Sequence, residues 1–254
     1  MRGKASFSGD AKRGEWRQIG RMTPYRLHYA PDNASLIVRL TLEEMGLPYA
    51  AVQVDRATQA QRGAPYLALN PHGRIPVLET PGSAIFETGA ILLWLADRHG
   101  GLFPGPDHPD RGDALKWLFF LSNTLHAELR MLFYPALYVG PDPAHQAALR
   151  DGLQASLSAH LARLEDVAGA GHAWLGGARP TVLDLYLATC LRWIALYPRD
   201  RAGWWDRSQA PHLARLCAQV EARPATRACA RAEGLGDRPF TAPDYPVPPE
   251  GSAT

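Results

Sequence analysis

Cysteine is scarce in this 254-residue chain, and its placement excludes several kinds of chemistry. The three thiols, Cys190, Cys217 and Cys229, are odd in number, widely spaced and confined to the C-terminal part. No Cys-x-x-Cys pair is present, and the nine histidines show no metal-ligand spacing. We therefore predict neither a disulfide framework nor a metal site, and expect a reduced, cytoplasmic setting.

Long apolar runs and an excess of charge are also missing. No apolar stretch approaches the roughly 20 residues needed to cross a bilayer. The net charge is only +2, which argues against a dedicated nucleic-acid binder. We predict no membrane and no nucleic-acid partner for a chain that, at 46% hydrophobic residues, can bury a substantial core.

The two ends of the chain differ from the rest in composition. Residues 1–22 carry six basic side chains but lack the apolar core of a signal peptide. We expect a disordered extension or an upstream start there, with a weak targeting sequence as the alternative. Residues 241–254 are rich in proline, and we expect a loosely held tail.

The first part of the chain alternates strand and helix patterns. Residues 25–31 and 50–55 read as strands, and an amphipathic helix over 33–45 separates them. Strand, helix, strand is the order that a parallel pair with a crossover requires. Residues 64–69 are expected to form a short second helix, so 23–100 would be an α/β domain.

Beyond a proline- and glycine-rich linker at 101–110, no strand pattern is found. Helical patterns run over 111–135 and 143–168, and Thr181 with Asp184 forms a capping-box-like pair before another apolar helix. We expect an all-helical domain over 111–240 and give the capping pair a structural role only.

The segment Asn70-Pro71-His72-Gly73-Arg74-Ile75-Pro76-Val77-Leu78 is the most informative in the chain. Proline has no N–H to donate, so Pro76 fits the first residue of a short strand at 77–79. The Ile75 backbone would then be free to pair with an extended, peptide-like ligand. An ordinary loop-to-strand proline is the alternative.

Glu87 and Thr88 follow at the start of an apolar helical pattern that ends at Gly100. Free N–H groups at such a helix terminus bind carboxylates, whereas a carboxylate side chain binds an ammonium group. The pair therefore suits the head of an α-amino acid. The alternative is that Thr88 only caps its helix and Glu87 is solvated.

With these two motifs in order and at this separation, the chain resembles the cytosolic glutathione transferase family, and its bacterial beta-like members in particular. The resemblance implies a thioredoxin-like N-terminal domain, an all-α C-terminal domain and a homodimer. It also implies that glutathione, as a substrate, is bound by Arg74, Ile75, Pro76, Glu87 and Thr88.

Such an enzyme must lower the pKa of the glutathione thiol, because the thiolate is the nucleophile. A decrease of about two units corresponds to roughly 2.7 kcal/mol. The beta-like cysteine would fall on Ala34, so it is absent. Asn33, which could donate to a thiolate, is our first candidate, followed by Ser35 and Tyr29; Asn33 could instead be a helix N-cap.

The acceptor site is expected along the first long helix of the second domain. Asn123, His126 and Arg130 recur at helical spacing and would share a face. If this face lines the interdomain cleft, His126 could reach the thiol region of glutathione, and Arg130 could reach a carboxylate. If the face is exposed to solvent instead, the spacing of the three residues has no functional meaning. Phe119, Phe133, Tyr134 and Tyr138 are candidates for an apolar wall or for core positions.

We consider two functions. The first is a glutathione transferase that activates the thiol for attack on a small electrophilic, mostly apolar acceptor. The second is a catalytically silent binding or regulatory protein, because the RNA-polymerase-associated stringent starvation proteins resemble this fold without the activity.

Overall fold

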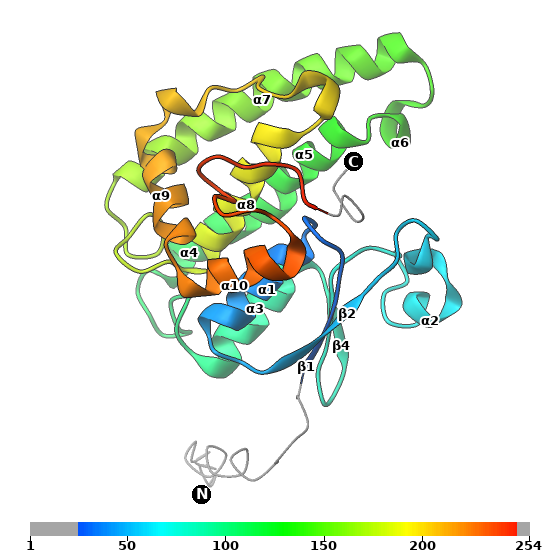
Figure 1. Cartoon of the computed structure of the whole chain (residues 1–254). Helices are drawn as coiled ribbons and strands as arrows, with labels where there is room; N and C mark the ends of the chain where they lie inside the picture. The colour runs from blue at the N-terminus through cyan, green and yellow to red at the C-terminus, as the bar shows by residue number, and fades with distance from the viewer. Residues whose placement is uncertain (1–24, 248–254) are drawn as a thin grey trace, which may run out of the picture.

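The computed structural model describes residues 25–247, which form a mixed sheet and a helical region (Figure 1). The sheet has the order β2-β1-β3-β4, built from β1 (Tyr25–Tyr29), β2 (Tyr49–Gln53), β3 (Val77–Glu79) and β4 (Ala84–Phe86). β1 and β2 are parallel, whereas β3 is antiparallel to both β1 and β4. The parallel pair is joined by a helix, as a crossover requires.

Helices cover both faces of this sheet. α1 (Ser35–Glu44) and α3 (Thr88–His99) lie between the sheet and the helical region, and the short α2 (Ala64–Leu67) lies on the opposite side (Figure 1). α1 is buried all round: Val38 faces the sheet core, and Leu36 belongs to the core of the helical region. A helix apolar on both faces belongs between two layers.

The helical region follows a segment without helix or strand at 100–110. Its helices are α4 (Arg111–Phe120), α5 (His126–Phe133), α6 (Ala136–Val139), α7 (Pro143–Gly169), α8 (Val182–Leu196), α9 (Pro211–Glu221) and α10 (Pro224–Glu233). α8 is buried along nearly its whole length and forms the centre of this region. Over the residues described, none of the helices has the length and apolar character that a bilayer-spanning helix needs.

The expected α/β plus all-α fold class is confirmed, and so is the capping box at the start of α8. The Thr181 hydroxyl accepts from the Leu183 N–H, and the Asp184 carboxylate accepts from the Thr181 N–H at 2.7 Å. One helix differs from expectation. The pattern over 111–135 is not one α-helix, because a π-helical turn at Leu121–Leu125 separates α4 from α5.

The end of the described chain also departs from expectation. We expected residues from 241 onward to be loosely held, but 241–247 pack against the helical region. The Tyr245 hydroxyl donates to the Leu196 carbonyl at 2.8 Å, and the Val247 N–H donates to the Gly234 carbonyl at 2.9 Å. Composition alone missed these contacts because it does not show that a partly buried tyrosine and a backbone hydrogen bond can hold a proline-rich segment. The predicted extension at 1–22 and the residues after 247 lie outside the described part.

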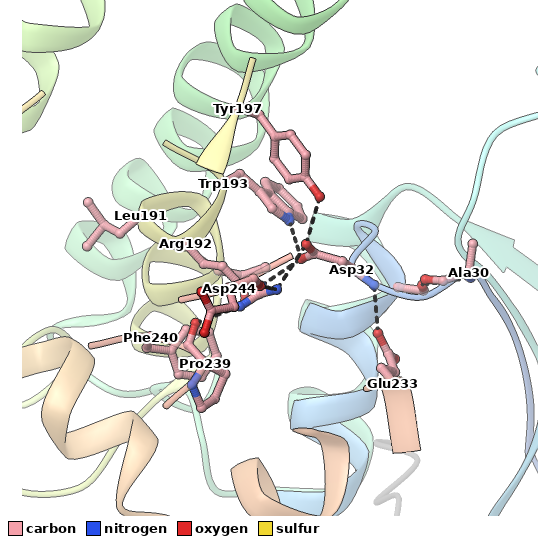
Figure 2. Close-up of polar contacts among 12 residues, drawn as sticks. Ala30, Asp32, Leu191, Arg192, Trp193, Tyr197, Glu233, Pro239, Phe240 and Asp244 are labelled. Carbon is pink, nitrogen blue, oxygen red and sulfur yellow. Dashed lines mark hydrogen bonds and ion pairs between the residues drawn. The ribbon is translucent and has the colours of Figure 1, made fainter. Parts of the chain in front are cut away.

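A buried polar cluster joins the two regions at Asp32, in the loop between β1 and α1 (Figure 2). Its carboxylate accepts two hydrogen bonds from Arg192, at 2.8 and 3.1 Å, and one each from Trp193 Nε1 and the Tyr197 hydroxyl, both at 3.1 Å. The Asp32 N–H donates to Glu233 Oε2 at 3.0 Å. Both members of the Asp32–Arg192 ion pair are fully buried. The loop is thus held by α8 and α10 together.

Arg192 uses its remaining donors on the C-terminal segment. It donates to the Pro239 carbonyl at 3.0 Å and to the Asp244 carbonyl at 2.8 Å. A guanidinium group offers its donors in a fixed fork, so one side chain satisfies the carboxylate and both carbonyls. The same cluster therefore fixes the loop, α8 and residues 239–244.

Asp32→Asn should destabilise the protein strongly. Removing one charge of a buried pair leaves the other uncompensated, and we expect the free energy of unfolding to fall by about 3 kcal/mol or more. Chemical denaturation measures this loss. The matched control is Asp97→Asn, which breaks a bidentate pair with Arg111 at the surface and should cost less than about 1 kcal/mol. Equal losses would contradict the role of Asp32.

Candidate functional site between the two domains

A cavity of about 370 Å³ lies between the α/β domain and the helical domain. The α/β domain contributes the loop after β1, the segment after β2, the loop before β3 and the start of α3. The helical domain contributes the π-helical turn, α5, α6 and two side chains of α8. This volume is that of a small-molecule site.

The loop before β3 is organised by Asn70, which is buried. Its amide nitrogen donates to the Arg74 carbonyl at 2.8 Å, and its Oδ1 accepts from the His72 N–H at 3.0 Å. Gly73 has a φ of +57°, and a Cβ there would lie 2.8 Å from the Gln61 carbonyl oxygen. Only glycine fits this close approach without movement. The loop is therefore rigid on the side that faces the cavity.

Ile75 and Pro76 line the cavity and are joined by a cis peptide bond. β3 begins at Val77, which pairs with His28 of β1 and Phe86 of β4. In the described part of the chain, the N–H and the carbonyl of Ile75 have no hydrogen-bond partner. Both groups are therefore unpaired where the sequence analysis expected an extended ligand to bind.

Glu87 and Thr88 line the same cavity at the start of α3. Glu87 has a φ of +69°, which is strained for a residue with a side chain. The first intrahelical bond of α3 runs from the Ile91 N–H to the Glu87 carbonyl, so the N–H groups of Thr88 and Gly89 precede it. Strained backbone of this kind is concentrated at ligand sites.

Asn33 also reaches the cavity, next to Ala34. Its Oδ1 accepts from the Ala34 N–H at 2.8 Å. The side-chain amide therefore presents its nitrogen, a donor with two hydrogens, away from that bond. The preceding residue is Asp32, so the interdomain cluster fixes the backbone from which Asn33 extends.

Ser35 and Tyr29, the other two thiolate candidates, are not brought to the cavity. Ser35 is fully buried, and its hydroxyl both donates to the Ala30 carbonyl, at 3.0 Å, and accepts from the Ala30 N–H, at 3.2 Å. The Tyr29 ring lies under the Arg39 guanidinium, with 4.1 Å from Cζ to the ring centroid. Their side chains are used inside the fold, which leaves Asn33 as the candidate in reach.

His126 opens α5 directly after the π-helical turn. Its Nδ1 lies 2.8 Å from the Tyr186 hydroxyl, and its ring packs against Trp193 with the centroids 5.1 Å apart. Desolvation, aided by the charge of Arg130, lowers the pKa of His126 to about 4. The imidazole is therefore neutral at physiological pH, a hydrogen-bonding group rather than a cation.

The π-helical turn changes which residues of this segment share a face. The His126 N–H donates to the Leu121 carbonyl, five residues back, so the wider turn rotates the preceding side chains relative to α5. Ser122 lines the cavity, whereas Asn123 is exposed and bonds only to Ser122 at 2.9 Å among the contacts of the described chain. The expectation that Asn123 shares the cavity face is wrong.

The other candidates for the acceptor site also differ in whether they reach the cavity. Arg130 and Tyr134 line the cavity, but Phe119, on α4, is 55% exposed and lies outside it. Phe133 and Tyr138, also candidates for the apolar wall, line the cavity as well. Sequence reasoning did not select the lining residues Arg56, Gln61, Arg62 and Trp193. Arg56 follows β2, and this position after a strand is the one sequence signal that could have identified it. The other residues reach the cavity through tertiary contacts.

The three cysteines are all buried in the helical domain, and none of them lines the cavity. Burial raises the pKa of each thiol, to about 11 for Cys217. A buried thiol of high pKa is a poor nucleophile. The cavity therefore offers no protein thiolate to a ligand.

Comparison with known proteins agrees with this geometry. Models of the glutathione S-transferase N-terminal domain and C-terminal domain match residues 34–98 and 147–219. Glutathione S-transferase GstA of Escherichia coli O157:H7 is 30% identical to the chain over 214 residues, which cover 83% of this chain and 99% of that protein. The chain belongs to the glutathione S-transferase family.

Two further relatives show the range of the similarity. The disulfide-bond oxidoreductase YfcG of Escherichia coli K12 is 28% identical over 220 residues, covering 83% of this chain and 96% of that protein. The solved structure of a sphingomonad glutathione S-transferase complexed with glutathione is 30% identical, with a TM-score of 0.69. The match covers 83% of this chain and all of that one.

The lowered pKa of His126 predicts a pH dependence of stability. The folded protein binds fewer protons than the unfolded chain between the folded pKa of about 4 and the ordinary value near 6.5. Stability should therefore decrease as pH falls through this window, by up to about 3 kcal/mol. His126→Gln should show a shallower decrease in denaturation between pH 7 and 4. Parallel curves for both proteins would contradict a neutral imidazole in the folded protein.

Proposed function

We propose that this protein is a glutathione transferase that binds glutathione in the interdomain cavity and activates its thiol for attack on a small electrophile. One observation carries the proposal: a single cavity brings together the unpaired backbone of Ile75, the strained Glu87 at the start of α3 and the amide of Asn33. The glutathione complex of the sphingomonad relative supports the same ligand.

Each group has a counterpart in glutathione. The γ-glutamyl head carries an ammonium group for Glu87 and a carboxylate for the N–H groups at the start of α3. The cysteinyl unit is flanked by two peptide bonds, which pair with the Ile75 backbone as an added strand would. Arg74, on the same loop, is available to the glycyl carboxylate. This orientation brings the thiol toward the loop after β1.

Activation of the thiol is assigned to Asn33. A hydrogen bond from a neutral amide to a thiolate favours the ionised form and lowers the thiol pKa. The neutral imidazole of His126 can add a second donor from Nε2 when the Tyr186 hydroxyl donates to Nδ1. Because no protein thiol lines the cavity, the protein cannot form a mixed disulfide with glutathione there. Catalysis then rests on positioning and thiolate stabilisation.

Binding of glutathione separates this proposal from that of a silent transferase-fold protein. Calorimetric titration should show binding of glutathione and of S-hexyl-glutathione, and Glu87→Gln should weaken glutathione binding about tenfold, because the ammonium group loses its charged partner. Asp97→Asn, the same loss of charge at the surface, should bind normally. Absence of binding to the wild-type protein would favour the silent protein, and unaltered affinity in Glu87→Gln would remove the γ-glutamyl assignment.

Asn33→Ala should raise the pKa of the bound thiol by about one unit, the effect of losing one hydrogen bond of roughly 1.4 kcal/mol to the thiolate. Ultraviolet titration of the thiolate measures this pKa, and conjugation at neutral pH should slow in proportion. Asn123→Ala, an exposed asparagine outside the cavity, is the matched control. If Asn33→Ala keeps the wild-type pKa, the thiolate is stabilised by another group.

A further inference from the structure

The cavity carries more positive charge than glutathione neutralises. Four guanidinium groups and one carboxylate line it, those of Arg56, Arg62, Arg74, Arg130 and Glu87, which gives a formal charge of +3. Bound glutathione with its thiol ionised has two carboxylates, one ammonium group and one thiolate, a charge of −2. The formal charge of the cavity with glutathione bound is therefore +1. It becomes +2 when the thiolate is converted to an uncharged thioether.

Arg130 is the arginine best placed to meet a second ligand. It extends from α5 of the helical domain, whereas the groups assigned to the backbone and carboxylates of glutathione come from the α/β domain. His126, on the same helix, is assigned only to the thiol. Its Nη1 donates to the Tyr138 hydroxyl at 2.5 Å, and within residues 25–247 it forms no ion pair with a carboxylate. Most of its five N–H donors are thus left for a ligand.

Aromatic rings surround this guanidinium. The Arg130 Cζ lies 5.7 Å from the centroid of the Tyr134 ring and 5.8 Å from that of Tyr138. Arg56 Nη2 donates to the Tyr134 hydroxyl at 3.3 Å. Phe133 of α5 and Leu137 of α6 also line the cavity. The wall therefore offers an apolar surface for a flat molecule and a planar cation at one end of it.

We propose that the acceptor is a conjugated or aromatic electrophile bearing a carboxylate, and that Arg130 binds this carboxylate. The proposal rests on the proposed glutathione transferase function and names the acceptor class of the same site. A guanidinium recognises a carboxylate through two parallel N–H bonds, so it fixes the orientation of the acceptor as well as its charge. The apolar body packs on the aromatic wall.

For an α,β-unsaturated ketone the step is an addition. The thiolate sulfur forms a bond to the β-carbon, the π electrons move to the α-carbon and carbonyl oxygen, and the enolate takes a proton from solvent. The thiol proton was released to solvent beforehand, so the balance needs no oxidant and no leaving group. The carboxylate takes no part in the bonds that form or break. It serves only to bind and orient the acceptor.

The test compares 4-(3-oxobut-1-enyl)benzoate with the corresponding benzamide, which differ at the para group and not at the reacting carbon. We expect kcat/KM, divided by the uncatalysed rate, to be at least tenfold higher for the acid. Arg130→Gln should reduce this acid-to-amide ratio at least tenfold, and Arg130→Lys should restore part of it. Arg199→Gln is the matched control, because Arg199 also lies over a tyrosine ring, at 4.1 Å, but outside the cavity.

Binding of the preformed glutathione conjugates gives a second reading that requires no turnover. The acid conjugate should bind the wild-type protein about tenfold more tightly than the amide conjugate, and this preference should disappear in Arg130→Gln. If the acid and amide acceptors are turned over equally well and their conjugates bind equally tightly, the proposal of an acidic acceptor is overturned, while the transferase function is left intact. An unchanged ratio together with weaker glutathione binding in Arg130→Gln would assign Arg130 to glutathione and also overturn it.

Discussion

The buried ion pair between Asp32 and Arg192 is the interaction on which the site depends. It joins the loop after β1 to the central helix of the other domain, 160 positions along the chain. Both groups are removed from water, so their hydrogen bonds must be complete for the pair to be tolerated. Trp193, Tyr197 and two backbone carbonyls supply the partners that make them complete (Figure 2).

This constraint connects stability with chemistry. Asp32 adopts a left-handed conformation with a φ of +50°, and its position determines where Asn33 projects into the cavity. Glu233 holds the same loop from α10, and desolvation raises the pKa of its carboxyl to about 7. The loop is therefore fixed from the helical domain, and the cavity needs both domains to be in place.

The strands, the short loop before β3 and the start of α3 could be predicted from the sequence because their signals are local. Pro76, Gly73 and Glu87 act through the backbone next to them. The position of Ser35 could not be predicted from the sequence, because its hydroxyl donates to the Ala30 carbonyl and this contact exists only in the folded protein. Asn123 was placed wrongly because a π-helical turn breaks the α-helical spacing on which the argument relied.

The contacts between domains carry no local signal. Nothing near Asp32 in the sequence indicates a partner in α8, and the cationic aromatic wall around Arg130 is assembled by folding. The charge balance of the cavity, which supports the proposed acidic acceptor, could be assessed only from the structure, although the sequence already named Arg130 as a candidate for binding a carboxylate. The resemblance to the family suggested glutathione as the ligand, and the geometry of the cavity indicated which residues can reach it.

The most direct test of the account is the pKa of the glutathione thiol bound to Asp32→Asn, measured under conditions in which this variant is still folded. If the interdomain pair positions Asn33, the thiol pKa should rise relative to the wild-type protein, by an amount approaching that of Asn33→Ala. A thiol pKa identical to that of the wild-type protein, in a folded but destabilised variant, would show that the pair supports the fold without positioning the Asn33 amide for the thiol.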